Sequence, residues 1–165
     1  MNLSKIKFES KDKKFYNIRI GRNKIKYKIK NVLCPFGLEN EYNNNIIKIE
    51  LKNDEENHIN FISLINNLND KIIDNFDAKE NEIKNNFRLR NDKFVFNCRL
   101  KKFKNNIIAN IKYNNSEDYL KTIYDFNKMS IIDAELELDN LWDFRENEQD
   151  NKLGYLININ NIVVY

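Results

Sequence analysis

Basic and aromatic residues are mixed in two stretches of the chain, and this mixture could bind a nucleic-acid strand. The first thirty residues carry eleven Lys or Arg residues against only Glu9 and Asp12, and a second basic stretch runs from Lys84 to Lys104, with phenylalanines from Phe87 to Phe103 among its cations. Cations neutralise phosphates and release counterions, and exposed aromatic rings stack unpaired bases at about 1–3 kcal/mol per base. The two stretches therefore predict a surface that binds single-stranded nucleic acid.

The predicted nucleic-acid-binding residues come from both stretches and from two isolated aromatic positions. They are Lys24, Lys26, Lys28, Lys30, Phe36, Arg88, Arg90, Arg99, Lys101, Phe103 and Trp142. The charge is the firmer part of this prediction, because Phe and Trp residues pack in cores more often than they stack on bases. Core packing and base stacking therefore both remain open for Trp142 and for the phenylalanines between Phe87 and Phe103.

A row of four carboxylates offers a different chemistry. Asp133, Glu135, Glu137 and Asp139 would lie on one side of a strand, where they could hold Mg²⁺ for phosphoryl transfer. A two-metal site usually gathers its carboxylates from several elements, and like charges in one row repel each other. We interpret the row as a solvated strand face and expect no metal site.

Nothing else in the sequence indicates catalysis or a cofactor. His58 is the only histidine, and we expect it on the surface near the start of a helix. No serine or cysteine lies in a nucleophile motif, and the three glycines are isolated, so no phosphate-binding loop is expected. The sequence predicts a non-catalytic protein without a cofactor.

Length and composition favour one domain over residues 1–165 in a reducing, intracellular compartment. The chain has 165 residues and 12% aromatic residues, enough for one packed core. Cys34 and Cys98 have no partner motif and are expected in that core. We expect no signal peptide and no membrane span, because no apolar run is long enough.

Period-two alternation predicts most of the elements, and one segment changes to a helical period. The predicted strands cover 14–20, 24–30, 46–52, 87–90, 93–101, 107–113, 130–138 and 153–165. Phe61, Ile65, Leu68, Ile72 and Phe76 recur on one face of a helix over about 54–76. Asn53 is the predicted N-cap of that helix. Residues 119–126 are ambiguous.

This order of elements predicts a mainly β protein. An antiparallel OB-like barrel with one helix fits the number of strands, and a β-sandwich remains an alternative. Residues 104–106 are predicted as a hairpin turn that returns 107–113 along the preceding strand. The lysines at 24, 26, 28 and 30 would then form the solvent face of their strand.

Several short motifs resemble a known family. The run from Ile29 to Glu39, with Pro35-Phe36-Gly37 at its corner, followed by Tyr42 and the strand from Ile46 to Leu51, is similar to small replication-associated proteins of nucleocytoplasmic large DNA viruses. The closing strands, from Met129 through Leu138, Leu141-Trp142 and Lys152 to Tyr155, are similar too. Those proteins resemble phage-type single-stranded-DNA-binding proteins with an OB fold, and the resemblance covers about two-thirds of the chain.

The resemblance implies an OB-type barrel and sequence-tolerant binding of single-stranded DNA, with DNA favoured over RNA. It implies a role in viral replication, recombination or repair, in the host cytoplasm or a viral factory. The acidic residues after Trp142, which are Asp143, Glu146, Glu148 and Asp150, would form an internal loop here. The free acidic C-terminal tail with which the phage proteins dock replication partners is therefore not expected in this chain.

Two other functions remain open. One is a structural or assembly protein, such as a minor virion component, whose basic and acidic faces pair between copies in a homo-oligomer. The other is a metal-dependent nuclease that uses the carboxylate row.

Overall fold

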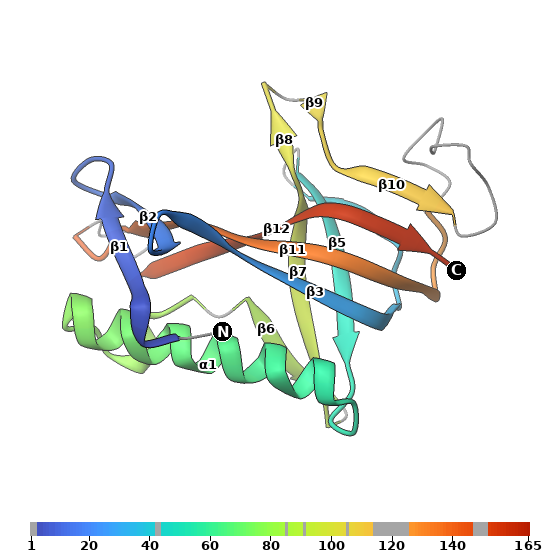
Figure 1. Ribbon diagram of the computed structural model, residues 1–165, viewed down its shortest axis with the longest axis horizontal. Coiled ribbons are helices and arrows are strands. Elements are labelled where there is room, and N and C mark those ends of the chain that lie inside the picture. The colour runs from blue at the N-terminus through green and yellow to red at the C-terminus, as the bar shows by residue number, and fades with distance from the viewer. Residues whose placement is uncertain are drawn as a thin grey trace.

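Five strands close into a ring and form an OB-like barrel (Figure 1). The computed structural model describes residues 3–41, 44–84, 86–90, 92–104, 106–113, 126–146 and 152–165. Around the ring, the strands are β3 (Asn23–Cys34), β5 (Asn44–Leu51), β7 (Lys93–Leu100), β12 (Leu153–Val164) and β11 (Ser130–Asp143). The β7–β12 pairing is parallel and the other four are antiparallel. The predicted mainly β, OB-like barrel is confirmed, and the described residues contain one α-helix.

Shorter elements extend this ring. The hairpin of β1 (Ile6–Ser10) and β2 (Phe15–Ile20) joins it at β11 and β3, while β4 (Leu38–Glu41) pairs with β5 and β6 (Phe87–Arg90) with β7. The remaining elements are β8 (Lys102–Phe103), β9 (Asn106–Ile107), β10 (Asn110–Tyr113) and the 3-10 helices η1 (Leu3–Lys5) and η2 (Glu80–Glu82).

The alternation in β3 places its residues as predicted. Ile25 and Ile29 are buried in the barrel, and Lys26 and Lys28 between them are exposed. The two thiols, of Cys34 and Cys98, are buried in the core as well, and burial raises the pKa of Cys34 to about 12.

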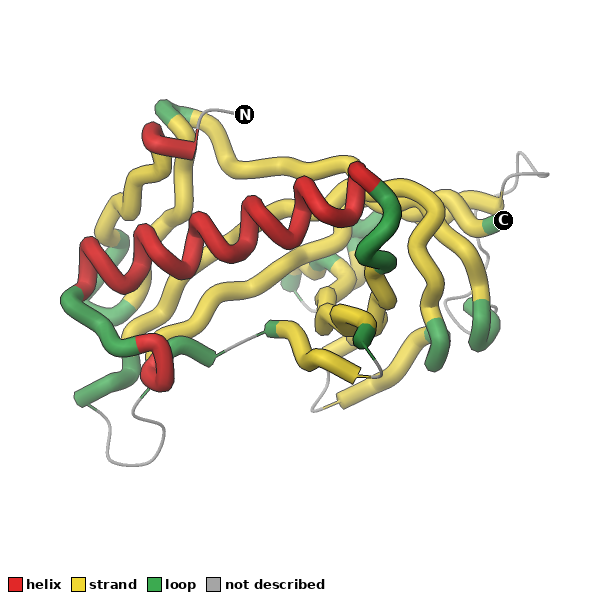
Figure 2. The backbone as a smooth tube through the Cα atoms, turned by 90° about the horizontal axis from the view of Figure 1, so that it is seen from below, coloured by secondary structure: helices red, strands yellow, loops and turns green. Residues whose placement is uncertain are grey.

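The helix α1 (Glu56–Phe76) lies across one end of the barrel (Figure 2). Its apolar face is buried, and the Phe61 ring lies 5.2 Å from Tyr27 and 5.3 Å from Phe96, measured between centroids. The helix begins two residues later than predicted. The predicted N-cap, Asn53, is wrong: Glu55 occupies that position, and the Asn53 amide donates a hydrogen bond to the Asp92 carbonyl. In the part of the chain that is described, no helix has the length and apolar character needed to cross a membrane.

The prediction that His58 lies on the surface is wrong. His58 is fully buried because it falls on the same helical face as Phe61 and Ile65. Its Nδ1 accepts the Lys52 N–H at 3.0 Å, and its Nε2 lies 2.7 Å from the Lys30 carbonyl oxygen. The ring therefore joins α1 to β3 and to the end of β5.

The region after β7 differs in part from its prediction. The predicted hairpin is present, because β8 pairs with β9 through Lys102 opposite Ile107 and Phe103 opposite Asn106. The chain does not return along β7, however, because one edge of β7 is taken by β5 and the other by β6 and β12. Instead β10 runs parallel to β12. The ambiguous segment 119–126 lies outside the described residues except for Phe126.

Gly37, at the β3–β4 corner, should tolerate substitution less well than Gly21, which lies between β2 and β3. Its φ is +69°, and a Cβ there would lie 2.9 Å from the Phe126 carbonyl oxygen. Gly21 has a similar φ of +61° but open space around it. We expect Gly21→Ala to lower the free energy of unfolding by about 1–2 kcal/mol through backbone strain alone, and Gly37→Ala by more. Urea denaturation of both variants checks this, and equal losses would contradict the packing at the corner.

Candidate nucleic-acid interface

The eleven predicted binding residues lie on three separate surfaces. Lys24, Lys26, Lys28, Lys30 and Lys101 lie along the outer face of β3, β11 and β12, which we call the lysine face. Phe36, Arg88, Arg90, Arg99 and Trp142 line cavities over β5 and β7. Phe103 stands apart on the β8–β9 hairpin, where 63% of it is exposed. The structure therefore does not bring all eleven together.

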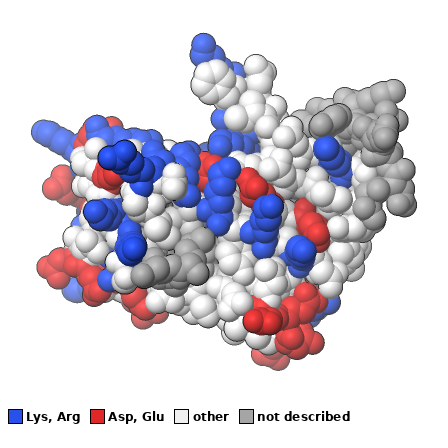
Figure 3. All heavy atoms as spheres, in the orientation of Figure 1, with Lys and Arg blue, Asp and Glu red and all other residues white. Residues whose placement is uncertain are grey.

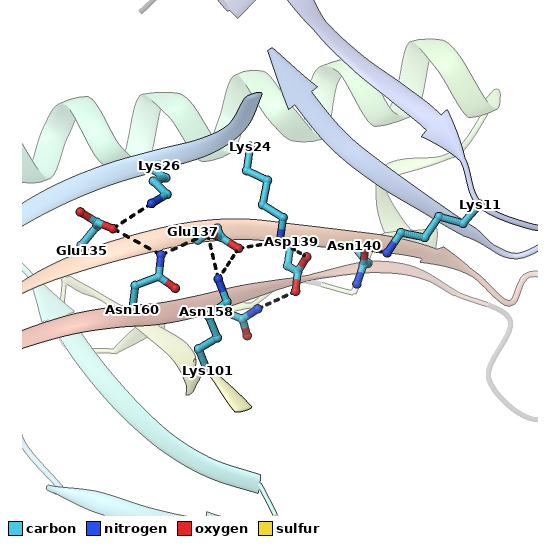
Figure 4. Close-up of polar contacts among 10 residues, drawn as sticks. All are labelled: Lys11, Lys24, Lys26, Lys101, Glu135, Glu137, Asp139, Asn140, Asn158 and Asn160. Atoms are coloured by element: carbon cyan, nitrogen blue, oxygen red, sulfur yellow. Dashed lines mark hydrogen bonds and ion pairs between the residues drawn. The ribbon is translucent and has the colours of Figure 1, made fainter. Parts of the chain in front are cut away.

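The lysine face is not a bare row of ammonium groups. The pairing of β3 with β11 places Lys28 opposite Glu135 and Lys26 opposite Glu137. Lys24 Nζ lies 2.7 Å from a Glu137 oxygen and 3.3 Å from an Asp139 oxygen, and Lys26 Nζ lies 3.3 Å from Glu135. Figure 3 shows lysines and carboxylates side by side on this face, and Figure 4 shows their contacts. Much of the lysine charge is therefore neutralised within the molecule.

Glu137 is the centre of this network, and the prediction of a solvated carboxylate row is wrong at this residue. Only 2% of its side chain is exposed, and it accepts hydrogen bonds from Lys24, Asn160 and Lys101. Burial alone would raise the pKa of this carboxyl, but these hydrogen bonds and the Lys24 charge lower it, to about 2. Lys24, Lys101 and Glu137 therefore form contacts that hold neighbouring strands of the barrel together.

The other carboxylates of the row are also engaged. Asp133 accepts hydrogen bonds from the Asn31 N–H and from the Tyr165 hydroxyl. Glu135 accepts hydrogen bonds from the Lys26 ammonium and from the Asn160 amide. Among the residues that the structure describes, no group of three or more His, Cys, Asp or Glu residues could hold a metal ion. These contacts give no support to a nuclease site in the row.

A groove crosses the opposite part of the ring, over the outer face of β5 and β7. A cavity of about 400 Å³ is lined by Phe36, Lys48, Arg88, Arg90 and Asn97, among others. In the strands below it, Lys48 of β5 lies opposite Asn97 of β7, and Arg88 of β6 lies opposite Val95. The alternation of β5, β6 and β7 therefore points these polar side chains to the same side.

Two neighbouring cavities lengthen this groove. One of about 370 Å³ shares Phe36, Arg90 and Val95 with the first cavity. Another, of about 360 Å³, shares Asn97 with it and continues to other basic and aromatic residues. We call the joined surface the barrel groove; its defining residues are Phe36, Lys48, Lys84, Arg88, Arg90, Asn97, Arg99 and Trp142.

Aromatic rings stand toward both ends of the barrel groove. Phe36 is half-buried at the β3–β4 corner, with Lys48 Nζ 5.6 Å and the Arg90 guanidinium carbon 5.8 Å from its ring centroid. Trp142 covers Gly154, where a Cβ would lie 2.2 Å from the indole, and its ring stacks on Phe144. Trp142 thus packs as a structural residue and also lines the groove.

The phenylalanines of the second basic stretch have separate roles. Phe96 is fully buried, and Phe87 packs against Phe94 and Phe96 with ring centroids 5.7 and 5.2 Å apart. These three belong to the core and its edge, whereas Phe103 is exposed. Phe87, Phe94 and Phe96 therefore pack in the core or at its edge and are not exposed stacking platforms.

The cations of the barrel groove are less neutralised than those of the lysine face. Lys48 pairs with Glu39, but Lys84, Arg88, Arg90 and Arg99 have no carboxylate within ion-pair distance among the described residues. Partial burial lowers the pKa of the Arg99 guanidinium, and the nearby charge of Asp139 opposes that effect. A half-buried cation without a direct ion pair is well suited to an anionic ligand.

Three groove residues were missing from the predicted set. Lys48 faces outward in the alternation of 46–52, and Lys84 belongs to the second basic stretch, so both had a signal in the sequence. Asn97 also faces outward in the alternation of 93–101, but its place beside Lys48 depends on the register between β5 and β7.

Comparisons with known proteins show the fold of the chain. No protein-family model and no curated protein matches the sequence. Gp2.5, a single-stranded DNA binding protein encoded by bacteriophage T7, matches the structure with a TM-score of 0.59 at 8% identity, over 86% of each chain. A C-terminally truncated single-stranded DNA-binding protein from bacteriophage Enc34 matches with a TM-score of 0.54 at 9% identity, over 98% of this chain and 95% of its own. The chain therefore has the fold found in these two phage proteins.

Replacing Glu137 should make stability depend less on pH. Because its pKa is lowered to about 2, the stability from its negative charge is complete above its ordinary value near 4.5 and is lost as the pH falls toward 2. We expect Glu137→Gln to lower the free energy of unfolding by about 1–3 kcal/mol at pH 7, by leaving buried partners unsatisfied, and by less at pH 3. Urea denaturation at pH 7, 4 and 3 measures this. The exposed Glu146→Gln is the control, and an equal loss at every pH would contradict the network.

Proposed function

We propose that the protein binds single-stranded DNA in the barrel groove and is not an enzyme. The observation that carries this proposal is the continuous groove over β5 and β7, with four basic side chains that have no carboxylate partner among the described residues. Arginine suits this role because its planar guanidinium binds phosphate through two N–H groups and stacks on aromatic rings. Arg88 and Arg90 supply such groups at one end of the groove and Arg99 at the other.

The position of the groove in the fold supports the proposal. OB folds bind oligonucleotides on the face of the second and third strands of the barrel, between the loops that follow the first and the fourth. In this chain, the second and third barrel strands are β5 and β7. Phe36 lies on the loop after the first, β3, and Trp142 stands where the fourth, β11, ends. That both comparison structures are single-stranded-DNA-binding proteins also supports this ligand.

The chemistry of the groove fits binding that tolerates any sequence. Phosphate contacts carry no sequence information, and every base has a face that can stack. We infer from the family resemblance that DNA is preferred over RNA, and that the protein acts in viral replication, recombination or repair, in the host cytoplasm or a viral factory.

The assembly alternative is less well supported. It requires that basic and acidic faces pair between copies, but Lys24 and Lys26 of β3 already pair with the carboxylates of β11 within one molecule. The carboxylates Glu135, Glu137 and Asp139 are thus already paired with lysines in the monomer and are less available to a second copy.

The first test compares the barrel groove with the lysine face. We expect the protein to bind labelled oligo-dT with micromolar or tighter affinity at low salt, measured by fluorescence anisotropy. Arg88→Gln with Arg90→Gln should weaken binding about tenfold and make the slope of log K against log salt shallower by about 1.4, since each phosphate on a single strand contributes about 0.7.

The matched control removes two cations from the lysine face. Lys28 and Lys30 are exposed and have no carboxylate within ion-pair distance among the described residues, so Lys28→Gln with Lys30→Gln should leave the fold intact. If this control weakens binding as much as the arginine variant does, the groove is not the main site. Absence of binding by the unaltered protein would reject the function.

A second test concerns base stacking at Phe36. Phe36→Leu keeps an apolar side chain at the corner but removes the aromatic ring, so we expect it to weaken oligo-dT binding by about 1–3 kcal/mol. The salt dependence should stay the same, because no charge is changed. Unchanged affinity in the same titration would show that Phe36 only shapes the corner.

A further inference from the structure

The β1–β2 hairpin is fixed to the barrel at the end of the barrel groove. Phe15 of β2 lies opposite Trp142 of β11, and the Asp143 N–H donates to the Lys14 carbonyl at 2.8 Å. The turn of the hairpin, residues 11–14, is therefore held beside Trp142. This hairpin lies outside the five-stranded ring, so closing the barrel does not require it (Figure 1).

Aromatic rings and cations continue from the groove onto this hairpin without a break. Trp142 stacks on Phe144 with centroids 5.3 Å apart, and Phe15 meets Phe144 edge-on at 5.7 Å. Lys84 Nζ lies 5.6 Å from the Trp142 ring, and Lys14 Nζ lies 5.7 Å from the Phe144 ring. The same two kinds of side chain that line the groove therefore extend past its end.

The lysines at the turn are open to a ligand. Lys11 and Lys13 are exposed, and 38% of Phe15 is exposed. Lys13 has no carboxylate within ion-pair distance among the described residues, and Lys11 contacts only the neutral amide of Asn140. Figure 3 shows Lys and Arg side chains gathered over β1 and β2.

The nearby carboxylates are occupied. Asp12 accepts the N–H groups of Lys14 and Phe15 at 2.8 and 3.0 Å and so shapes the turn. Asp143 is held by the Arg145 guanidinium at 2.9 and 3.0 Å. Neither acid forms an ion pair with Lys11 or Lys13, so both lysines could bind phosphates.

We propose that the β1–β2 hairpin is a second segment of the interface, which binds the part of a single strand that runs beyond the barrel groove. The strand would leave the groove at Trp142, pass over Phe144 and Phe15, and place its phosphates at Lys14, Lys13 and Lys11. This inference rests on the proposed function and adds the length and the exit of the bound strand to it.

The test compares oligonucleotides of two lengths. OB folds bind about 4–16 nucleotides, so oligo-dT of about 6 nucleotides should fill the groove alone and oligo-dT of about 16 nucleotides should also reach the hairpin. The variant is Lys11→Gln with Lys13→Gln, and the matched control is Lys5→Gln with Lys71→Gln, two lysines on η1 and α1. Anisotropy titrations at several salt concentrations give the affinity and its salt slope.

We expect the hairpin variant to bind the short oligonucleotide like the unaltered protein. It should bind the long one about tenfold more weakly, with a slope shallower by about 1.4, whereas the control should bind both normally. Unchanged binding of the long oligonucleotide, or an equal loss for both lengths, would overturn the hairpin proposal while leaving the groove in place. If the unaltered protein binds neither length, the proposed function fails and the hairpin proposal with it.

Discussion

One buried carboxylate joins the strands at the point where the barrel closes. Glu137 of β11 accepts hydrogen bonds from Lys24 of β3, from Asn160 of β12, and from Lys101 directly after β7. The backbone pairing between β7 and β12 spans only two residue pairs, so the ring is held weakly there by its backbone alone. Because three strands and the residue after a fourth meet at one charge, this network holds the end of β7 against β11 and β12, and β7 is the floor of the barrel groove.

This arrangement separates the basic residues into two groups. In β3, Lys24 and Lys26 form ion pairs with carboxylates of β11. These ion pairs stabilise the register between the two strands and leave less charge for a ligand. The arginines of β6 and β7 lie beside Phe36 and Asn97 and have no such carboxylate partner among the described residues. A basic strand in a sequence is therefore not by itself a binding surface. The neighbouring strand decides whether its charge is available to a ligand.

Most of the fold, and five of the eight residues that define the barrel groove, could be predicted from the sequence. Period-two alternation was enough for β3, β5, β7 and β11, and helical spacing was enough for α1, because both patterns are local. The pairing of Lys24 with Glu137 could not be predicted, since 113 positions separate them and the register of β3 on β11 brings them together. The polarity of His58 predicts a surface position, but its spacing from Phe61 and Ile65 places it on the buried face of α1. Phe36, Arg88 and Arg90 were predicted, but their grouping into one groove depends on how β5, β6 and β7 pair.

In the proposed complex, a single strand binds over β5 and β7 and not over β3 and β11. A titration of ¹⁵N-labelled protein with oligo-dT, followed by backbone amide NMR, tests it most directly. We expect the amide signals of Lys48, Asn97 and Arg99 to shift with added oligonucleotide. Those of Lys26, Lys28 and Glu135 should stay in place. Shifts confined to the lysine face, or no shifts at all, would contradict it.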